Sequence, residues 1–343
     1  MDLYILNQSF EPLAIIDNYV SLIWIKRYYT CGDFELYMSA DKNLLEYLKQ
    51  DYFIIREDDD AIMVIEKIEI TTDAENGDFF IISGRSAESL LSRRIIWTQT
   101  NIHATSPTTG IYSLIFNNAI GTDARGIPNL AVNSQFSISG KLDVQFTGDN
   151  LMEAISEICM EFGIGFKIAL TNGKLMFSCY QGNSVDVTFS QEFDNLINSD
   201  YSNDYTEYKN CGLTAGEGEG TLRKTVTVWN TKSEPSGFNR REVFIDARDM
   251  STNDGEIPLD TYITQLKQRG LEKLNEHVAT KTFEGSIEPT MTYRYKNDYD
   301  LGDVVNVINE YGISAQPRII EIIESWDENG YAVVPTFEEW EVN

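Results

Sequence analysis

Apolar and polar residues alternate along much of the first hundred positions. Phe34, Leu36 and Met38 are separated by more polar neighbours, a period of two that is typical of a strand with one buried face. The segments 20–29 and 79–82 carry apolar residues on both faces, which favours strands buried on both faces. Several strands with few helices predict a small barrel or sandwich here.

Turn signals divide the chain into hairpins. The acidic run 58–60 lies between two short apolar segments, and the pairs Asn76–Gly77 and Asn172–Gly173 do the same further along. Asn-Gly readily supplies the positive φ of a tight turn, so each pair predicts a hairpin. Asp41 and Ser86 precede short apolar runs and are expected to cap short helices.

A different pattern begins near position 99. The stretch 107–128 holds Pro107, Gly121, Gly126 and Pro128, and we expect it to form a loop. Residues 151–162 place their apolar side chains on one helical face. Gly163 follows, and glycine commonly ends a helix in the left-handed conformation. This part is predicted to be an α+β unit.

The later part of the chain combines polar strands with one more helix. Asp260 is expected to cap a helix on which Leu266, Gly270 and Leu274 share one stripe. Glycine inside a helix costs about 1 kcal/mol relative to alanine, so Gly270 predicts a close packing contact. Apolar segments near the end of the chain, including 304–308, predict further strands. Gly302 lies between acidic neighbours just before that segment, so we expect a tight turn in which this glycine takes a positive φ.

Together these patterns predict a β-rich α+β fold, with two small β-barrel-like domains, an intervening α+β unit and a helical insertion. The predicted parts are residues 1–98, the first barrel-like domain; 99–184, the α+β domain; 185–282, strands and the helical insertion; and 283–343, the second barrel-like domain, with strands from about 222–246.

Composition restricts the possible partners. The chain has 343 residues and a formal charge of -27, from 54 acidic and 27 basic residues. This excess repels nucleic acid and anionic membrane surfaces. It either keeps a concentrated assembly protein soluble or forms a lumen wall that DNA passes without sticking. The amino terminus lacks the features of a signal peptide and no apolar run is long enough to span a bilayer, so we expect no membrane insertion.

Candidate catalytic groups are sparse. His103 and His277 are the two histidines, and they would have to carry most general-base or metal chemistry at neutral pH. His277 follows a predicted helix, where a cation complements the helix dipole. No nucleophile motif such as GxSxG lies near His103. Cys31, Cys159, Cys179 and Cys211 lack CxxC spacing, so we expect reduced, mostly buried thiols.

The segment Gly216–Gly220 has alternating glycines but no P-loop lysine, and its glutamates would repel phosphate. We expect a close backbone approach there. The carboxylate pairs Glu217/Glu219, Asp246/Asp249 and Glu338/Glu339 are expected by chance among so many acidic residues. No stretch has EF-hand spacing. We therefore predict no enzyme, and no catalytic, cofactor-binding or metal residues.

Several segments together resemble the tail-hub proteins of long-tailed phages of Gram-positive bacteria, which also form the amino-terminal part of tail-associated lysins. These segments are Ile81–Ser86 followed by Leu91–Ile96, Gly216–Gly220 followed by Arg223, Arg240–Asp249 and Asp298–Val305.

The resemblance implies a homotrimer whose six related β-barrels form a pseudo-sixfold ring at the tip of a virion tail. It implies contacts with the distal tail protein, the tape-measure protein and receptor-binding or lysin tip proteins, and a tube closed until DNA passes through its lumen. The protein would be made in the host cytoplasm. Larger relatives continue into lytic or adhesive segments, which we expect either on another polypeptide or on a part of the protein outside this sequence. The alternative function is a carbohydrate-binding or host cell-wall-binding module, because five Trp and 18 Tyr could stack on sugars.

Overall fold

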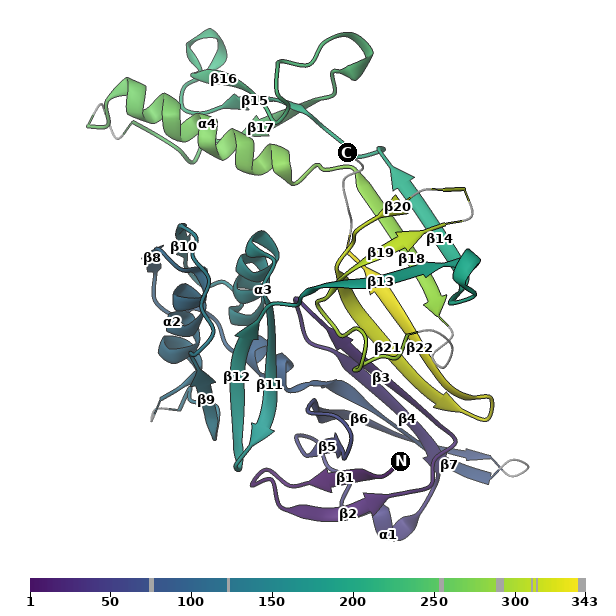
Figure 1. Ribbon diagram of the computed structural model, residues 1–343. Coiled ribbons are helices and arrows are strands. Elements are labelled where there is room, and N and C mark those ends of the chain that lie inside the picture. The colour runs from purple at the N-terminus through teal and green to yellow at the C-terminus, as the bar shows by residue number, and fades with distance from the viewer. Residues whose placement is uncertain are drawn as a thin grey trace. The chain divides into compact units, whose positions relative to one another are not determined.

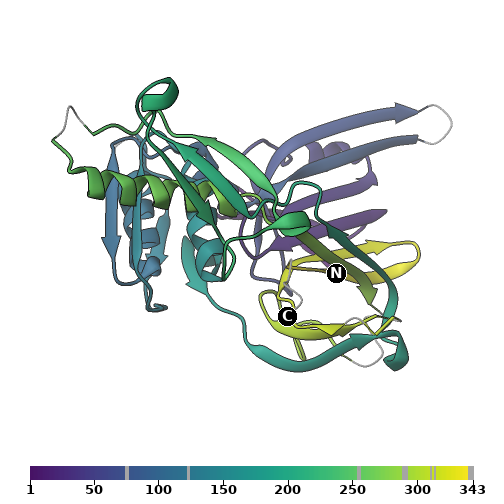
Figure 2. The same ribbon diagram turned by 90° about the horizontal axis from the view of Figure 1, so that it is seen from above.

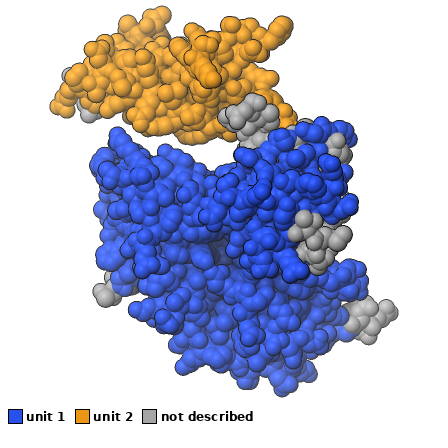
Figure 3. Space-filling model, viewed as in Figure 1, with its two compact units in different colours: residues 1–199, 284–338 blue, residues 200–283, 339–343 orange. Residues whose placement is uncertain are grey.

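A computed structural model describes residues 1–73, 77–121, 124–252, 256–287, 293–309, 311–312 and 314–338, with the backbone alone at 73, 196–200 and 280–287. The chain divides into two units (Figure 3). Unit 1 comprises 1–199 and 284–338, and unit 2 comprises 200–283 and 339–343.

The largest sheet contains eleven strands, in the order β14-β18-β22-β21-β3-β4-β7-β6-β5-β1-β2. The β6–β7 hairpin projects beyond its neighbours (Figures 1 and 2). The strands are β1 (Leu3–Leu6), β2 (Pro12–Ile16), β3 (Ser21–Arg27), β4 (Asp33–Ser39), β5 (Phe53–Arg56), β6 (Ile62–Asp73), β7 (Gly77–Ser86), β14 (Leu196–Asp204), β18 (Thr280–Ile287), β21 (Ile319–Asp327) and β22 (Gly330–Phe337).

This sheet joins the two ends of the chain. β21 pairs antiparallel with β3, and Glu324 lies opposite Trp24. Two β regions that the sequence suggests as separate barrel-like domains therefore share one sheet. The fold class, β-rich and α+β, is confirmed, while the domain limits at 98, 184 and 282 stay a prediction.

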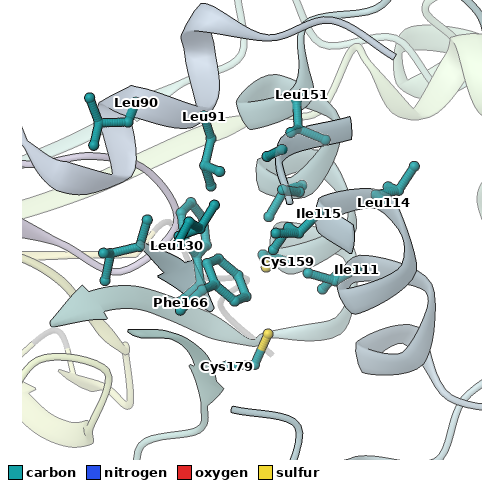
Figure 4. Close-up of a cluster of buried hydrophobic side chains, with 14 of the residues drawn as sticks. Leu90, Leu91, Ile111, Leu114, Ile115, Leu130, Leu151, Cys159, Phe166 and Cys179 are labelled. Atoms are coloured by element: carbon teal, nitrogen blue, oxygen red, sulfur yellow. The ribbon is translucent and has the colours of Figure 1, made fainter. Parts of the chain in front are cut away.

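The α+β part of unit 1 packs two helices and a 3-10 helix against small sheets. Their apolar side chains form one core, part of which is shown in Figure 4. The elements are η1 (Ala87–Arg93), β8 (Thr100–Ala104), α2 (Pro107–Ala119), β9 (Leu130–Asn133), β10 (Leu142–Phe146), α3 (Leu151–Phe162), β11 (Gly165–Thr171) and β12 (Lys174–Tyr180).

Helix α2 contradicts the predicted loop over 107–128. Pro107 occupies the first turn of the helix, where its missing N–H has no helical partner to lose. Ile111, Leu114 and Ile115 are fully buried and have the three- and four-residue spacing of one helical face. The apolar face therefore outweighs the turn-forming residues that follow it.

Local turn and cap predictions are largely confirmed. Asn172 and Gly173 have φ of 51° and 71° in the β11–β12 turn. Gly163 ends α3 with φ of 62°. The Asp41 carboxylate accepts the Asn43 N–H and caps α1 (Lys42–Leu45).

One predicted cap and one predicted turn remain to be compared with the structure. The Ser86 side chain makes no capping hydrogen bond, because its hydroxyl accepts the Gly32 N–H at 2.7 Å. Gly77 has φ of 88° at the start of β7, while Asn76 lies outside the described residues.

A further sheet of unit 1 contains β13 (Ser184–Ser190), β19 (Val304–Ile308) and β20 (Ser314–Ala315). Gly302 precedes β19 and has φ of 95°. The predicted left-handed turn before this strand is therefore confirmed, and it matters for the packing described below.

Unit 2 contains the three-stranded sheet β16-β15-β17 and helix α4. The bounds are β15 (Cys211–Ala215), β16 (Thr225–Trp229), β17 (Glu242–Asp246) and α4 (Leu259–Asn275). The strands within 222–246 pair with β15. This corrects the expectation that they join the carboxy-terminal barrel, because their apolar side chains pack against α4 in a separate core.

Helix α4 begins two residues earlier than predicted, after Pro258. The prediction that Asp260 caps it is wrong, because Asp260 lies in the first turn, where a carboxylate still complements the helix dipole. The close contact predicted at Gly270 is confirmed. A Cβ there would lie 2.2 Å from the Thr214 hydroxyl oxygen of β15.

Candidate assembly site at the Tyr28 junction

Tyr28 follows β3 and is fully buried where three segments of unit 1 meet. Its ring lies so close to Gly165 and Gly302 that a Cβ on either glycine would be 2.3 Å from the Cε2 atom. Real Cβ atoms do not approach other atoms so closely. Glycine at both positions therefore allows the ring to lie between β11 and the turn before β19.

The Tyr28 hydroxyl is anchored by backbone groups. It donates to the Gly163 carbonyl at 3.2 Å and accepts the Gly182 N–H at 3.3 Å. These contacts connect β3 to both ends of the β11–β12 hairpin. Burial raises the pKa of the Tyr28 phenol, so the group stays neutral and structural.

Residues near the carboxy terminus complete the junction. The Arg318 guanidinium lies 5.3 Å from the Tyr28 ring centroid and donates to the Gly302 carbonyl at 2.6 Å. Tyr29 donates its hydroxyl to the Glu338 carboxylate at 2.7 Å. The junction therefore links the start, middle and end of the chain.

A buried ionic cluster ties the same ends together at a second place. The Arg56 guanidinium lies 5.3 Å and 4.4 Å from the rings of Trp24 and Trp326. It donates to both oxygens of Glu324, at 3.1 and 3.2 Å, and also to Asp58. Removing one member of such a buried pair leaves the other charge without compensation.

Asp59 extends this cluster. Its carboxylate is fully buried and lies 2.7 Å from the ammonium groups of both Lys26 and Lys296. Burial alone would raise the pKa of Asp59, but the two lysines outweigh that effect and hold it well below its ordinary range. The carboxylate is therefore a permanently charged structural link.

A cavity of about 480 Å³ adjoins Lys26, Lys167 and Lys296. Its lysines are paired with carboxylates of the 58–60 run. Glu88 also lines it and accepts the Ile168 N–H at 2.5 Å. Among the residues that the structure describes, no group of three His, Cys, Asp or Glu side chains is arranged to hold a metal.

Neither histidine lines this cavity. His103 lies exposed on β8, beside Asp143 at 2.8 Å. His277 follows the end of α4 and donates its backbone N–H to the Leu274 carbonyl, which is the position predicted for it.

No helix within the described ranges is both long and apolar enough to cross a membrane.

All four cysteines are free and buried, as predicted. Burial raises the pKa of the Cys179 thiol to about 12. Since the thiolate is the reactive form, this cysteine is unreactive at neutral pH.

The segment Gly216–Gly220 has the predicted close backbone approach. A Cβ on Gly216 would lie 2.0 Å from the Tyr262 hydroxyl oxygen, which accepts the Glu217 N–H at 2.8 Å. The Glu217 carboxylate accepts the Thr252 N–H at 2.7 Å. Glu217 thus supports a loop. Glu339, of the pair with Glu338, lies outside the described residues.

The tryptophans that a sugar-binding site would need lie mostly in packed surroundings. Trp24 and Trp326 enclose a guanidinium group. Trp97 is exposed, but an arginine covers its ring at 5.1 Å. Trp229 is partly exposed on the unit 2 sheet, and Trp340 lies outside the described part of the chain. Trp24 and Trp326 are therefore unavailable to a sugar ring, whereas Trp97 and Trp229 are exposed.

The fold defined by these elements is that of phage tail proteins. The 43 kDa tail protein of prophage MuSo2 from Shewanella oneidensis superimposes with a TM-score of 0.62 at 13% identity, covering 98% of each chain. A tail protein from Neisseria meningitidis MC58 gives 0.59 at 11% identity, covering 99% of this chain and 96% of that one. The prophage tail protein gp18 from Listeria monocytogenes EGD-e gives 0.56 at 12% identity, with coverage of 99% and 96%.

The family of Siphovirus ReqiPepy6 Gp37-like proteins matches residues 2–337, so the chain belongs to this family. The match confirms the resemblance to siphovirus tail proteins that the sequence motifs suggest. No curated protein matches the sequence.

Sequence reasoning missed the Tyr28 junction and the Arg56 cluster. The members of each are far apart in the chain, so no local spacing connects them. The sequence does contain two separate signals for the Tyr28 junction. Gly302 is expected in a left-handed turn, and Tyr28 belongs to an apolar segment. The partnership between them appears only in three dimensions.

Proposed function

We propose that this protein is the structural hub at the distal tip of a siphovirus tail. Three copies would form a ring that joins the tail tube and distal tail protein to the tip and closes the tube until DNA leaves. The observation that carries the proposal is the match to a siphovirus family over residues 2–337. The tail-protein fold over nearly the full length of both chains supports it.

The Tyr28 junction and the Arg56 cluster suit a structural protein that must withstand force. The Tyr28 junction and the Arg56 cluster both connect segments near the start and the end of the chain within unit 1. In a ring, these connections would keep the strands of the eleven-stranded sheet together when neighbouring tail proteins exert force on the subunit. The hub would act without catalysis, and its lysines and carboxylates would serve as structural ion pairs.

The charge of -27 agrees with a lumen through which DNA passes. A negative wall repels the phosphate backbone, so it lets DNA slide without binding. The distal tail protein, the tape-measure protein and receptor-binding or lysin tip proteins would be the neighbours of the ring.

Imaging of assembled virions tests this proposal. Antibody or gold labelling of the protein should mark the distal end of the tail, and an averaged image should show threefold density there. Particles made without the protein should lack a finished tip. Labelling along the tail shaft or on the head would refute the proposal, as would normal tails in its absence.

A further inference from the structure

An exposed tryptophan and two arginines form one surface of unit 1, beside the carboxy-terminal end of α2. Trp97 is 68% exposed, and its backbone N–H donates to the Asn118 side chain of α2 at 3.2 Å. The Arg125 guanidinium lies 5.1 Å from the centre of the Trp97 ring. Ile95 is 41% exposed nearby. We call Arg94, Ile95, Trp97 and Arg125 the arginine–tryptophan surface.

Backbone groups hold this surface in place. The Arg125 guanidinium donates to the Ile95 carbonyl at 2.7 Å, and the Arg94 guanidinium donates to the Arg125 carbonyl at 2.5 Å. The Arg94 carbonyl in turn accepts the Leu151 N–H of α3 at 3.0 Å. Side chains that are already fixed lose little conformational entropy when they bind a partner, so the surface is preorganised.

Arg94 is a cation without a counterion in an acidic chain. Within the described ranges, its guanidinium donates to the carbonyls of Arg93 and Arg125 and to no carboxylate, and its side chain is partly exposed. The guanidinium group matches the geometry of a carboxylate. Arginine and tryptophan are also enriched among the residues that contribute most of the energy in protein interfaces. The surface therefore fits a partner that presents a carboxylate beside an aromatic side chain.

The turn between β21 and β22 has this complementary composition. Asp327 and Glu328 are exposed there, and neither carboxylate pairs with a cation in the described part of the chain. Asp327 accepts the Asn329 N–H at 2.7 Å, which fixes the turn. Tyr331 follows and is 40% exposed, with its ring centroid 4.9 Å from that of Trp326. The hairpin thus carries carboxylates and an aromatic ring at one end.

The two surfaces lie on separate flanks of unit 1. Helix α2 and strand β8 lie on one flank, and the β21–β22 turn projects from another (Figures 1 and 2). Because the two surfaces differ, a contact between them joins one copy to the next head to tail. Contacts of this kind form a ring when the rotation between copies closes. A contact between two identical faces would instead stop at a pair.

We propose that the arginine–tryptophan surface binds the β21–β22 turn of a second copy of the chain, with Arg94 facing Glu328. The inference rests on the proposed ring, for which it names the contact between neighbouring copies. The chain carries a charge of -27, so most contacts between copies are repulsive. Local pairing of opposite charges therefore decides which surfaces meet.

Sedimentation analysis of the purified full chain over a wide concentration range tests the contact. Arg94→Glu and, separately, Glu328→Lys should each weaken self-association at least about tenfold, because each change places like charges opposite one another. Glu328→Lys makes the chain less negative, so relief of general repulsion would act in the opposite direction. Both changes in one chain restore opposite charges across the contact, and association should return towards that of the parent.

Lys174→Glu is the matched control for Arg94→Glu. Lys174 is exposed beside the β11–β12 turn, and its replacement changes the net charge by the same amount, so association should stay close to that of the parent. Trp97→Ser removes the aromatic part of the surface without changing the charge, and it should also weaken association. Melting temperatures close to the parent's would separate a lost contact from lost folding.

The outcomes distinguish the contact from the ring. If the parent associates and neither Arg94→Glu nor Glu328→Lys weakens it, the contact is wrong, although a hub assembled through other surfaces would survive. Equal weakening by Lys174→Glu, or no recovery in the double variant, would also overturn the contact. A parent that stays monomeric at every concentration refutes it as well, and labelling of virions then tests the hub independently.

Discussion

Replacing Gly302 with alanine tests the packing of Tyr28 directly. Gly302 has φ of 95°, and a left-handed conformation costs an L-residue about 1 to 2 kcal/mol. The added Cβ would also lie 2.3 Å from Cε2 of a fully buried ring. Forcing an extra methyl into a packed core costs typically about 1 to 3 kcal/mol. Gly302→Ala should therefore destabilise unit 1 by about 2 to 5 kcal/mol.

Gly148→Ala separates the two contributions. Gly148 has φ of 79°, but no atom lies within 4 Å of its would-be Cβ, so alanine there should cost only the backbone penalty. Thermal unfolding measures the difference, since about 1 kcal/mol shifts the melting temperature of a domain of this size by about 2 to 4 °C. Gly302→Ala should melt several degrees below Gly148→Ala.

A double-mutant cycle then assigns the excess to the ring. Tyr28→Leu removes Cε2, so Gly302→Ala should cost less in that background than in the parent. The expected coupling is on the order of 1 kcal/mol or more, within the range for residues in contact. Equal melting of Gly302→Ala and Gly148→Ala would refute the reasoning, and additive effects in the cycle would show that Tyr28 is not the obstacle.

Three other experiments test the remaining contacts. Burial raises the pKa of Glu88 in the folded protein. The stability that the Glu88 side chain contributes is therefore fully present below its pKa in the unfolded chain, about 4.3, and is lost as the pH rises through its pKa in the folded protein. Glu88→Gln should therefore raise the melting temperature at pH 7 and match the parent near pH 4; the same difference at both pH values would contradict this. Arg56→Met should cost about 3 to 5 kcal/mol in urea unfolding, because Glu324 remains buried and charged; adding Glu324→Gln should recover part of the loss, and no recovery would argue against the pair. Glu217→Gln with Glu219→Gln should leave any hydrolytic activity on peptidoglycan unchanged, since a glutamine oxygen still accepts the loop hydrogen bond; loss of a defined activity would overturn the structural interpretation.

Features fixed by local chemistry could be predicted from the sequence. Asn172–Gly173, Gly163 and Gly302 adopt positive φ as expected, because few residue types tolerate that conformation without strain. The strand that follows Gly302 also has the predicted bounds, residues 304–308. In each case the determining atoms belong to the residue or its immediate neighbours.

Competing local signals account for the wrong predictions. Over 107–128 the prolines and glycines favoured a loop, although Ile111, Leu114 and Ile115 form an apolar helical face. Burial of that face in the core shown in Figure 4 decides the outcome. Propensity is a weak guide where tertiary packing stabilises a helix.

Strand partners could not be predicted because their selection is non-local. β3 and β21 meet across nearly the whole chain, and the pattern of either strand is satisfied by any sheet that buries the same face. The β16 and β17 strands show the same ambiguity, because their apolar residues are compatible both with a barrel strand and with a strand covered by α4.

The two junctions explain how this ambiguity is resolved in the folded chain. Pairing of β3 with β21 could slip by two residues and keep every side chain on the same face, but a slip would move Trp326 away from the Arg56 guanidinium that it covers. It would also separate Arg318 from the Tyr28 ring and from the Gly302 carbonyl that it holds. Both anchors depend on the same register and both join distant segments, so they specify one alignment that hydrophobic patterning alone leaves open.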